Sequence, residues 1–169
     1  MVGALAAAGV IGGGNGSSNG TQQTIGTVRT SSTVTLPFEA TPEEARLAEL
    51  IPPVIVPDCR RGKELSSAML ATVSCSPPDA SVTYSLFESP GTLSTYMNAR
   101  VGLGDSERKC GQAPSGSSTY NAEGETVGRL VCYVRQSHAW IEWSNVRAVV
   151  YAYGYRADGD WKALFNFWN

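Results

Sequence analysis

The four cysteines of this 169-residue chain constrain its fold more than any other feature. They occur as two successive pairs, Cys59 with Cys75 and Cys110 with Cys132. Within each pair the spacing is far wider than the two-residue gap of zinc or thioredoxin-type motifs. The chain also holds a single histidine, His138, that could complete a metal site. We therefore expect disulfide bonds, and neither a metal nor a cofactor.

Four cysteines allow three disulfide pairings. We favour Cys59 with Cys75 and Cys110 with Cys132, because each bridge would tie an irregular segment to the strand that follows it. Each closed loop would stabilise the fold by roughly 3 kcal/mol in the chain-entropy treatment. Since cytoplasmic thiols are kept reduced, this interpretation predicts an extracytoplasmic location. The alternative is four buried free thiols in a cytoplasmic core.

The composition of the N-terminal residues indicates a tether close to a membrane. Residues 1–11 are all apolar or small, and residues 12–20 are rich in glycine, serine and asparagine. The apolar run is too short to span a bilayer, and it lacks the basic residues that begin a signal peptide. We interpret residues 1–40 as the remnant of a membrane segment followed by a flexible Gly/Ser/Thr-rich tether, and residues 41–169 as a single domain. A disordered Ala/Gly tail is the alternative.

Residues 41–169 alternate between strand-like and helical patterns. Thr41, Pro42 and Glu44 match a capping box with proline at the first helical position, and the helix should end before Pro52. A second helix should begin after Ser89, and an amphipathic third should carry aromatic residues from Trp161 onward, capped by Asp158 or Asp160. Alternating residues predict strands over 71–75, 82–87, 127–135, 139–144 and 148–156.

These elements predict an α+β fold, an antiparallel sheet of about five strands in the order β-β-α-β-β-β-α, with two disulfides. Short connections require antiparallel neighbours. In the last strand, Ala148, Val150, Ala152 and Gly154 alternate with the tyrosines. Because small residues allow close approach, we expect the helices to pack on that one face. The polar residues 105–124 are predicted to form a loop.

Charge and motif content argue against several classes of function. A formal net charge of −2 gives no broad basic field, so nucleic-acid binding is not expected. Asp158, Gly159 and Asp160 lack the further oxygen ligands of a calcium loop, and a capped turn is favoured. No nucleophile motif accompanies His138, which we place in an exposed turn. We therefore expect that the protein is not an enzyme.

Aromatic residues supply the one candidate binding surface. Large rings stack on apolar ligand faces at low entropic cost, so a row of them can form a platform for a cell-wall glycan or a peptide. The candidate residues are Tyr133, Trp143, Tyr151, Tyr153 and Tyr155. The alternative is ordinary packing of the second face of the sheet.

Several segments between residues 47 and 168 carry a family resemblance through their order and spacing. They are Leu-Ile-Pro at 50–52 before Asp58-Cys59-Arg60, Ala71 to Cys75, Val82 to Phe87 ahead of a helix with Tyr96, Val127-Gly128-Arg129 leading to Cys132-Tyr133, Ile141-Glu142-Trp143, and residues 156–160 before Leu164 and Trp168. The chain resembles the extracytoplasmic C-terminal region that follows the single membrane helix of many actinobacterial serine/threonine protein kinases and related envelope proteins. It carries no kinase domain. The resemblance implies a sensor or binding role outside the cell, and it brings no catalytic residues.

We therefore expect a non-catalytic ligand-binding or sensory domain of the cell envelope, membrane-anchored through its N-terminal segment or secreted. Its ligand would be a cell-wall fragment or a peptide. The alternative is a structural or assembly protein that self-associates when the Thr-rich stretch 21–36 adds as a strand to a neighbour's sheet.

Overall fold

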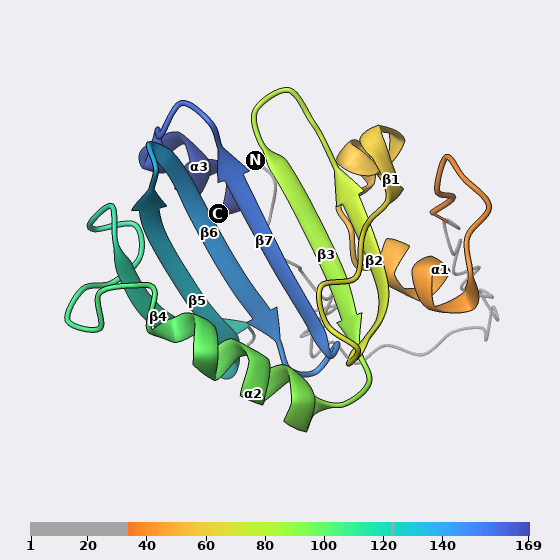
Figure 1. Cartoon of the computed structure of the whole chain (residues 1–169), viewed down its shortest axis with the longest axis horizontal. Coiled ribbons are helices and arrows are strands. Elements are labelled where there is room, and N and C mark those ends of the chain that lie inside the picture. Colours follow the sequence, from red (N-terminus) through yellow and green to blue (C-terminus); the bar gives the residue numbers. More distant parts are fainter. Residues whose placement is uncertain (1–33, 123) are drawn as a thin grey trace, which may run out of the picture.

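The computed structural model describes residues 34–122 and 124–169, which form one sheet with helices around it (Figure 1). The predicted apolar segment and most of the predicted tether lie outside the described residues. The helices are α1 (Pro42–Ala48), the 3-10 helix η1 (Pro53–Asp58), α2 (Pro90–Val101) and α3 (Trp161–Trp168). The strands are β1 (Cys59–Arg61), β2 (Met69–Cys75), β3 (Ser81–Phe87), β4 (Gly116–Ala122), β5 (Glu125–Arg135), β6 (His138–Asn145) and β7 (Val150–Arg156). Across these residues, no helix has the length and apolar content that crossing a membrane requires.

The sheet has seven strands in the order β1-β2-β3-β7-β6-β5-β4, and every neighbouring pair is antiparallel. The α+β class and the antiparallel pairing are confirmed, but the prediction of about five strands is wrong. The two additional strands are the edge strands β1 and β4. β4 lies inside the stretch predicted as a loop, because Gly-Ser-Ser-Thr-Tyr-Asn-Ala has no apolar alternation to reveal it.

The helices lie on both faces of the sheet, so the prediction that they share one face is wrong. Leu47 of α1 and Leu164 of α3 are buried with Val150 and Ala152 of β7, and we call this side the first face. On the opposite side, the second face, α2 packs against the tyrosine side of β7. In that cluster Leu93 and Met97 of α2 lie with Phe87, Val131, Tyr133 and Tyr151. The small residues of β7 on the first face therefore do not determine where every helix packs.

Each α-helix starts where the sequence predicts, whereas the 3-10 helix η1 was not predicted. Thr41 accepts a hydrogen bond from the Glu44 amide at 3.2 Å, and the Glu44 carboxylate accepts one from the Thr41 amide at 2.8 Å, which completes the capping box. Ser89 caps α2 and Asp160 caps α3 in the same way, through the amides of Thr92 and Ala163. Such caps each contribute about 1 kcal/mol.

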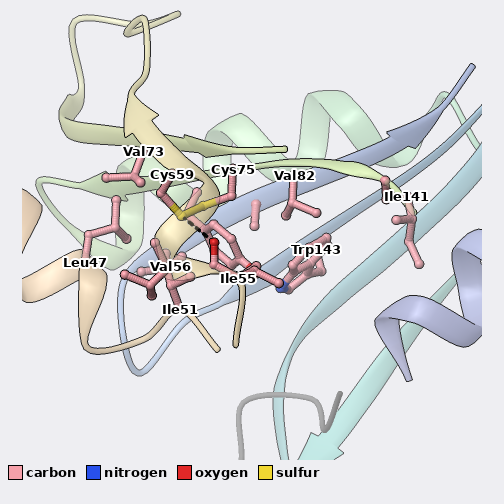
Figure 2. Packing of buried hydrophobic residues seen from close by; sticks show 14 of the residues in the cluster. Leu47, Ile51, Ile55, Val56, Cys59, Val73, Cys75, Val82, Ile141 and Trp143 are labelled. Carbon is pink, nitrogen blue, oxygen red and sulfur yellow. Dashed lines mark hydrogen bonds between the residues drawn. A yellow bond between two sulfur atoms is a disulfide. The ribbon is translucent and has the colours of Figure 1, made fainter. Parts of the chain in front are cut away.

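The first face holds the larger core (Figure 2). Leu47, Ile51 and Val73 are almost fully buried around the Cys59–Cys75 bridge, and Trp143 lies further along the same face. Full burial of a side chain such as Leu47 contributes roughly 1.5–3 kcal/mol. Leu36 is buried in this core as well. Packing therefore begins before Thr41, within the segment predicted as tether.

Both favoured disulfides are present, Cys59–Cys75 and Cys110–Cys132, and no described cysteine is free. Cys59 and Cys75 are direct partners in the register of β1 and β2. The second bridge attaches the connection between α2 and β4 to the middle of β5. Two disulfides indicate an oxidising, extracytoplasmic environment.

Candidate functional site

The candidate site lies on the second face of the sheet, beyond the part that α2 covers. Figure 1 shows α2 crossing the sheet near its lower end, while no helix crosses the upper part of the same face. Three large rings from the central strands, Trp140, Tyr153 and Tyr155, are half-buried here. Partly exposed aromatic rings that lie side by side on a rigid sheet commonly form binding surfaces.

Cross-strand register brings these rings together. Tyr133 of β5 is paired with Trp140 of β6, and Trp140 is paired with Tyr155 of β7. The ring planes are nearly parallel, with centroids 6.2 Å apart at 10° for the first pair and 5.0 Å apart at 27° for the second. Tyr153 adds a ring 6.1 Å from Trp140. We call Tyr133, Trp140, Tyr153 and Tyr155 the aromatic row.

A buried ionic network lies next to the aromatic row. The Glu142 side chain is 1% exposed and forms a bidentate ion pair with Arg100 of α2, whose Nε donates to Oε2 at 2.7 Å. The hydroxyls of Tyr133 and Tyr151 donate to the two carboxylate oxygens at 2.6 and 2.8 Å. We call these four residues the Glu142 network. It joins α2 to strands β5, β6 and β7.

Burial shapes the protonation of this network. Burial, followed by the nearby Glu142, raises the pKa values of both Tyr133 and Tyr151. Hydrogen bonding to Glu142 raises the pKa of Arg100. The tyrosines are therefore neutral donors and Arg100 is a permanent cation. Both Glu142 oxygens and both tyrosine hydroxyls are hydrogen-bonded within the protein, so the arrangement is that of a structural anchor.

The structure separates the five residues of the predicted platform. Tyr153 and Tyr155 lie on the open part of the second face. Tyr133 and Tyr151 share that face but are buried, with their hydroxyls on Glu142. Trp143 lies on the opposite face, where it packs edge-on against Tyr84 and Trp168, so its inclusion in the predicted platform is wrong.

Trp140 is central to the aromatic row but was not among the residues of the predicted platform. Alternation along residues 139–144 puts Trp140 and Trp143 on opposite faces, because side chains change face at every residue. That signal was present in the sequence. The contact with Tyr155, however, requires the register of β6 against β7, which no local pattern specifies.

A pocket adjoins the end of the aromatic row. It is an open hollow of about 360 Å³, lined by residues 77–81 of the β2–β3 turn and residues 155–158 at the end of β7. Arg156 joins the two walls. Its guanidinium makes two hydrogen bonds to the Asp158 carboxylate, at 3.1 and 2.6 Å, and one to the Asp79 carbonyl at 2.7 Å. We call this hollow the terminal pocket.

The remaining predicted positions have local structural roles. Asp160 caps α3, and hydrogen bonding to Arg156 lowers the pKa of Asp158 to about 2. His138 opens β6 with its Nδ1 2.7 Å from the Gln136 carbonyl oxygen, and its ring lies 6.3 Å from that of Tyr155. Among residues 34–122 and 124–169, no three His, Cys, Asp or Glu side chains are grouped to hold a metal ion.

Comparison with known proteins gives no match, whether to a family model, to a curated protein or to a solved structure.

Proposed function

We propose that this protein is a non-catalytic ligand-binding or sensory domain of the cell envelope, with its ligand on the aromatic row. The observation that carries the proposal is the set of half-buried rings Trp140, Tyr153 and Tyr155 on a sheet face that α2 leaves open. A cell-wall glycan or a peptide is the ligand class that suits such rings, since both present flat apolar surfaces edged by polar groups.

Rigidity favours binding by these rings. They stand on adjacent, fully paired strands, and stacking fixes their planes relative to one another. The hydrogen bond from the Tyr133 hydroxyl to the buried Glu142 carboxylate fixes the position of the Tyr133 ring. A surface that is already ordered loses little conformational entropy when a ligand binds, and more of the contact energy then appears as affinity.

A binding role also fits the engagement of two carboxylates at the site in contacts within the fold. The carboxylate of Glu142 is occupied by Arg100 and two tyrosines, and that of Asp158 is occupied by Arg156. A general acid or base needs a proton within reach of a substrate. These groups are instead committed to contacts within the fold.

The proposal includes attachment to the outer side of a membrane. The two disulfides support an oxidising compartment, and the apolar residues 1–11 with the Gly/Ser-rich residues after them support an anchor and a tether. The resemblance to the extracytoplasmic regions of actinobacterial serine/threonine protein kinases supports a sensory role in the same place.

Thermal unfolding tests the binding function. A ligand that binds only the folded state raises its stability by about 2.7 kcal/mol at a concentration one hundred times Kd. We expect one or more soluble cell-wall fragments, or envelope-derived peptides, to raise the Tm of the full chain. Trp140→Ala and Tyr155→Ala should remove that rise, measured against each variant's own Tm.

Trp161→Ala is the matched control, because Trp161 is a half-buried indole on α3 that packs against the first-face core. It should keep the ligand-induced rise. The absence of any rise across the fragments and peptides would contradict the proposed function.

A second function, envelope assembly, is favoured by the outer edge of β4. In the described chain β4 pairs with β5 alone, and on its other side the Ser117 amide donates to the Arg108 carbonyl at 2.9 Å. An edge strand of this kind can accept an added strand from the Thr-rich residues before Val34 of another copy. Sedimentation over a range of concentrations tests it: oligomers should form and should disappear when residues 21–33 are deleted, which keeps the core residue Leu36.

A further inference from the structure

The stack of aromatic rings stops at β7 and does not continue onto the neighbouring strand β3. Along one register line of the second face, β5, β6 and β7 contribute Tyr133, Trp140 and Tyr155, and the next strand contributes Ser81. One face of the Tyr155 ring stacks on Trp140 at 5.0 Å. Tyr155 and Ser81 both line the terminal pocket. The position next to Tyr155 therefore carries the small side chain of Ser81, so space for a fourth ring remains beside the stack.

The walls of this space are preformed. Arg156 is 21% exposed at its side chain and bonds simultaneously to Asp158 after β7 and to the Asp79 carbonyl in the β2–β3 turn. These contacts hold the two turns at a fixed separation. Pro77 and Pro78 further restrict the backbone of the wall opposite Tyr155. A volume of about 360 Å³ lies at the small end of the range for ligand pockets, which suits a single ring unit.

The chemistry of the lining selects among ring-shaped ligands. Tyr155, the two prolines and two alanines are apolar, while Ser81, Asp79, Arg156 and Asp158 supply donors and acceptors at the rim. With Arg156 and Asp158 paired, Asp79 leaves the lining with one net negative charge, which disfavours an anionic ligand. Arg156 and Asp158 neutralise each other but keep hydrogen-bonding capacity for neutral hydroxyls, since a guanidinium carries five N–H donors.

We infer that the terminal pocket binds one uncharged sugar ring of a glycan, stacked on the outer face of Tyr155 as the fourth member of the row. The hydroxyls of that ring reach Asp79, Ser81 and the Arg156–Asp158 pair. This inference rests on the proposed binding function and names its ligand class. The rest of the glycan continues over the aromatic row.

The sharpest test of the sugar site is a substitution that fills the space beside Tyr155. Ser81→Tyr places a ring of the protein's own where the sugar would stack, on a side chain that already faces the second face. It should weaken glycan binding by at least about tenfold, because the lost stacking and hydrogen bonds are worth more than 1.4 kcal/mol. Thr119→Tyr is the matched control, since it adds the same ring at an exposed position on the far edge strand β4.

The probes are the uncharged tetrasaccharides of β-1,4-linked N-acetylglucosamine, β-1,4-linked glucose, α-1,4-linked glucose and β-linked galactose, with tetralysine and decaproline as peptide probes. Binding to the full chain is measured by titration in ¹H–¹⁵N correlation spectra. We expect at least one tetrasaccharide to shift the amides of Ser81, Tyr155 and Ala157. Ser81→Tyr should raise the Kd read from the Tyr155 and Ala157 shifts at least about tenfold, while Thr119→Tyr should leave it unchanged.

Each other outcome overturns the inference in a distinct way. Saccharide binding at Trp140 and Tyr153 that Ser81→Tyr leaves unchanged would keep the binding function and remove the terminal pocket from it. Binding of tetralysine or decaproline alone would replace the glycan with a peptide. Failure of all six probes to bind would overturn the sugar site, while the thermal screen against cell-wall fragments and envelope-derived peptides separately decides the binding function.

Discussion

Glu142 shows how a single residue can organise this site. Within the described chain it is the most completely buried charged side chain, yet none of its oxygens lacks a partner. A buried carboxylate is costly unless a cation and hydrogen-bond donors surround it. Arg100 and the two tyrosines meet that need, and in doing so they fix α2 over the sheet. The open part of the second face begins where this contact ends.

Glu142→Gln should lower the free energy of unfolding by about 2–4 kcal/mol, because it leaves Arg100 without its counter-ion in a largely desolvated place. Arg100 is 34% exposed and can recover some hydration, which keeps the loss below that of a fully buried pair. Urea unfolding monitored by circular dichroism measures it.

The chain offers a matched control in Glu125, which pairs with Arg147 at 73% exposure. Glu125→Gln should change stability by less than about 1 kcal/mol. Equal losses from the two substitutions would contradict the anchoring role of Glu142.

Alkaline pH should destabilise the fold through its buried tyrosines. Burial raises the pKa of Tyr120 to about 12 and raises the pKa values of Tyr84 and Tyr151 further. Above about pH 10 the unfolded chain releases these protons and the folded chain retains them, so stability present below pH 10 is lost as pH rises. Each such tyrosine accounts for about 1.4 kcal/mol of loss at pH 11.

Urea unfolding at pH 9, 10 and 11 measures this dependence. Tyr151→Phe removes one titrating hydroxyl, so its stability should fall less steeply with pH than that of the unsubstituted protein. A variant that follows the same steep fall would show that Tyr151 ionises with an ordinary pKa in the folded protein.

Among the elements, those with strong local signals could be predicted from sequence. The capping box at Thr41 and Glu44, the Ser89-Pro90 start and the spacing from Trp161 to Trp168 marked all three α-helices. Alternating apolar residues marked five strands and both pairs of cysteines followed from their positions beside them.

Elements defined by pairing rather than by composition could not be predicted. β4 is polar and owes its place to backbone hydrogen bonds with β5, while β1 is only three residues long. Alternation shows which residues of β7 share a face, but it does not show which helix covers that face. Tyr151 is buried with Leu93 and Met97 of α2, a contact between distant parts of the chain that no local pattern specifies.

The connection between α2 and β4 depends on its disulfide. It contains few buried residues, so Cys110–Cys132 is the strongest link between this segment and β5. Replacing both cysteines by alanine should lower the free energy of unfolding by about 3 kcal/mol. Urea unfolding measures the loss, with the Cys59–Cys75 bridge left intact for comparison. An unchanged free energy would show that the segment is held by its other contacts.

At the scale of the whole molecule, the two bridges tie opposite ends of one sheet. Cys75 lies in β2 and Cys132 lies in β5, on either side of the central strands. Native material should therefore resist alkylation. Mass spectrometry after treatment with iodoacetamide should show no added group on folded protein and four after reduction and unfolding. Four reactive thiols in native protein would remove the case for an oxidising compartment.

The position of β7 determines when the sheet can be completed during synthesis. Strands β1 to β3 and strands β4 to β6 each follow one another as antiparallel neighbours, and β7 alone joins the two groups at the centre. Until residues 150–156 have been made, neither group has its inner edge covered. The protein therefore completes its sheet late, when the last strand becomes available to pair with both groups.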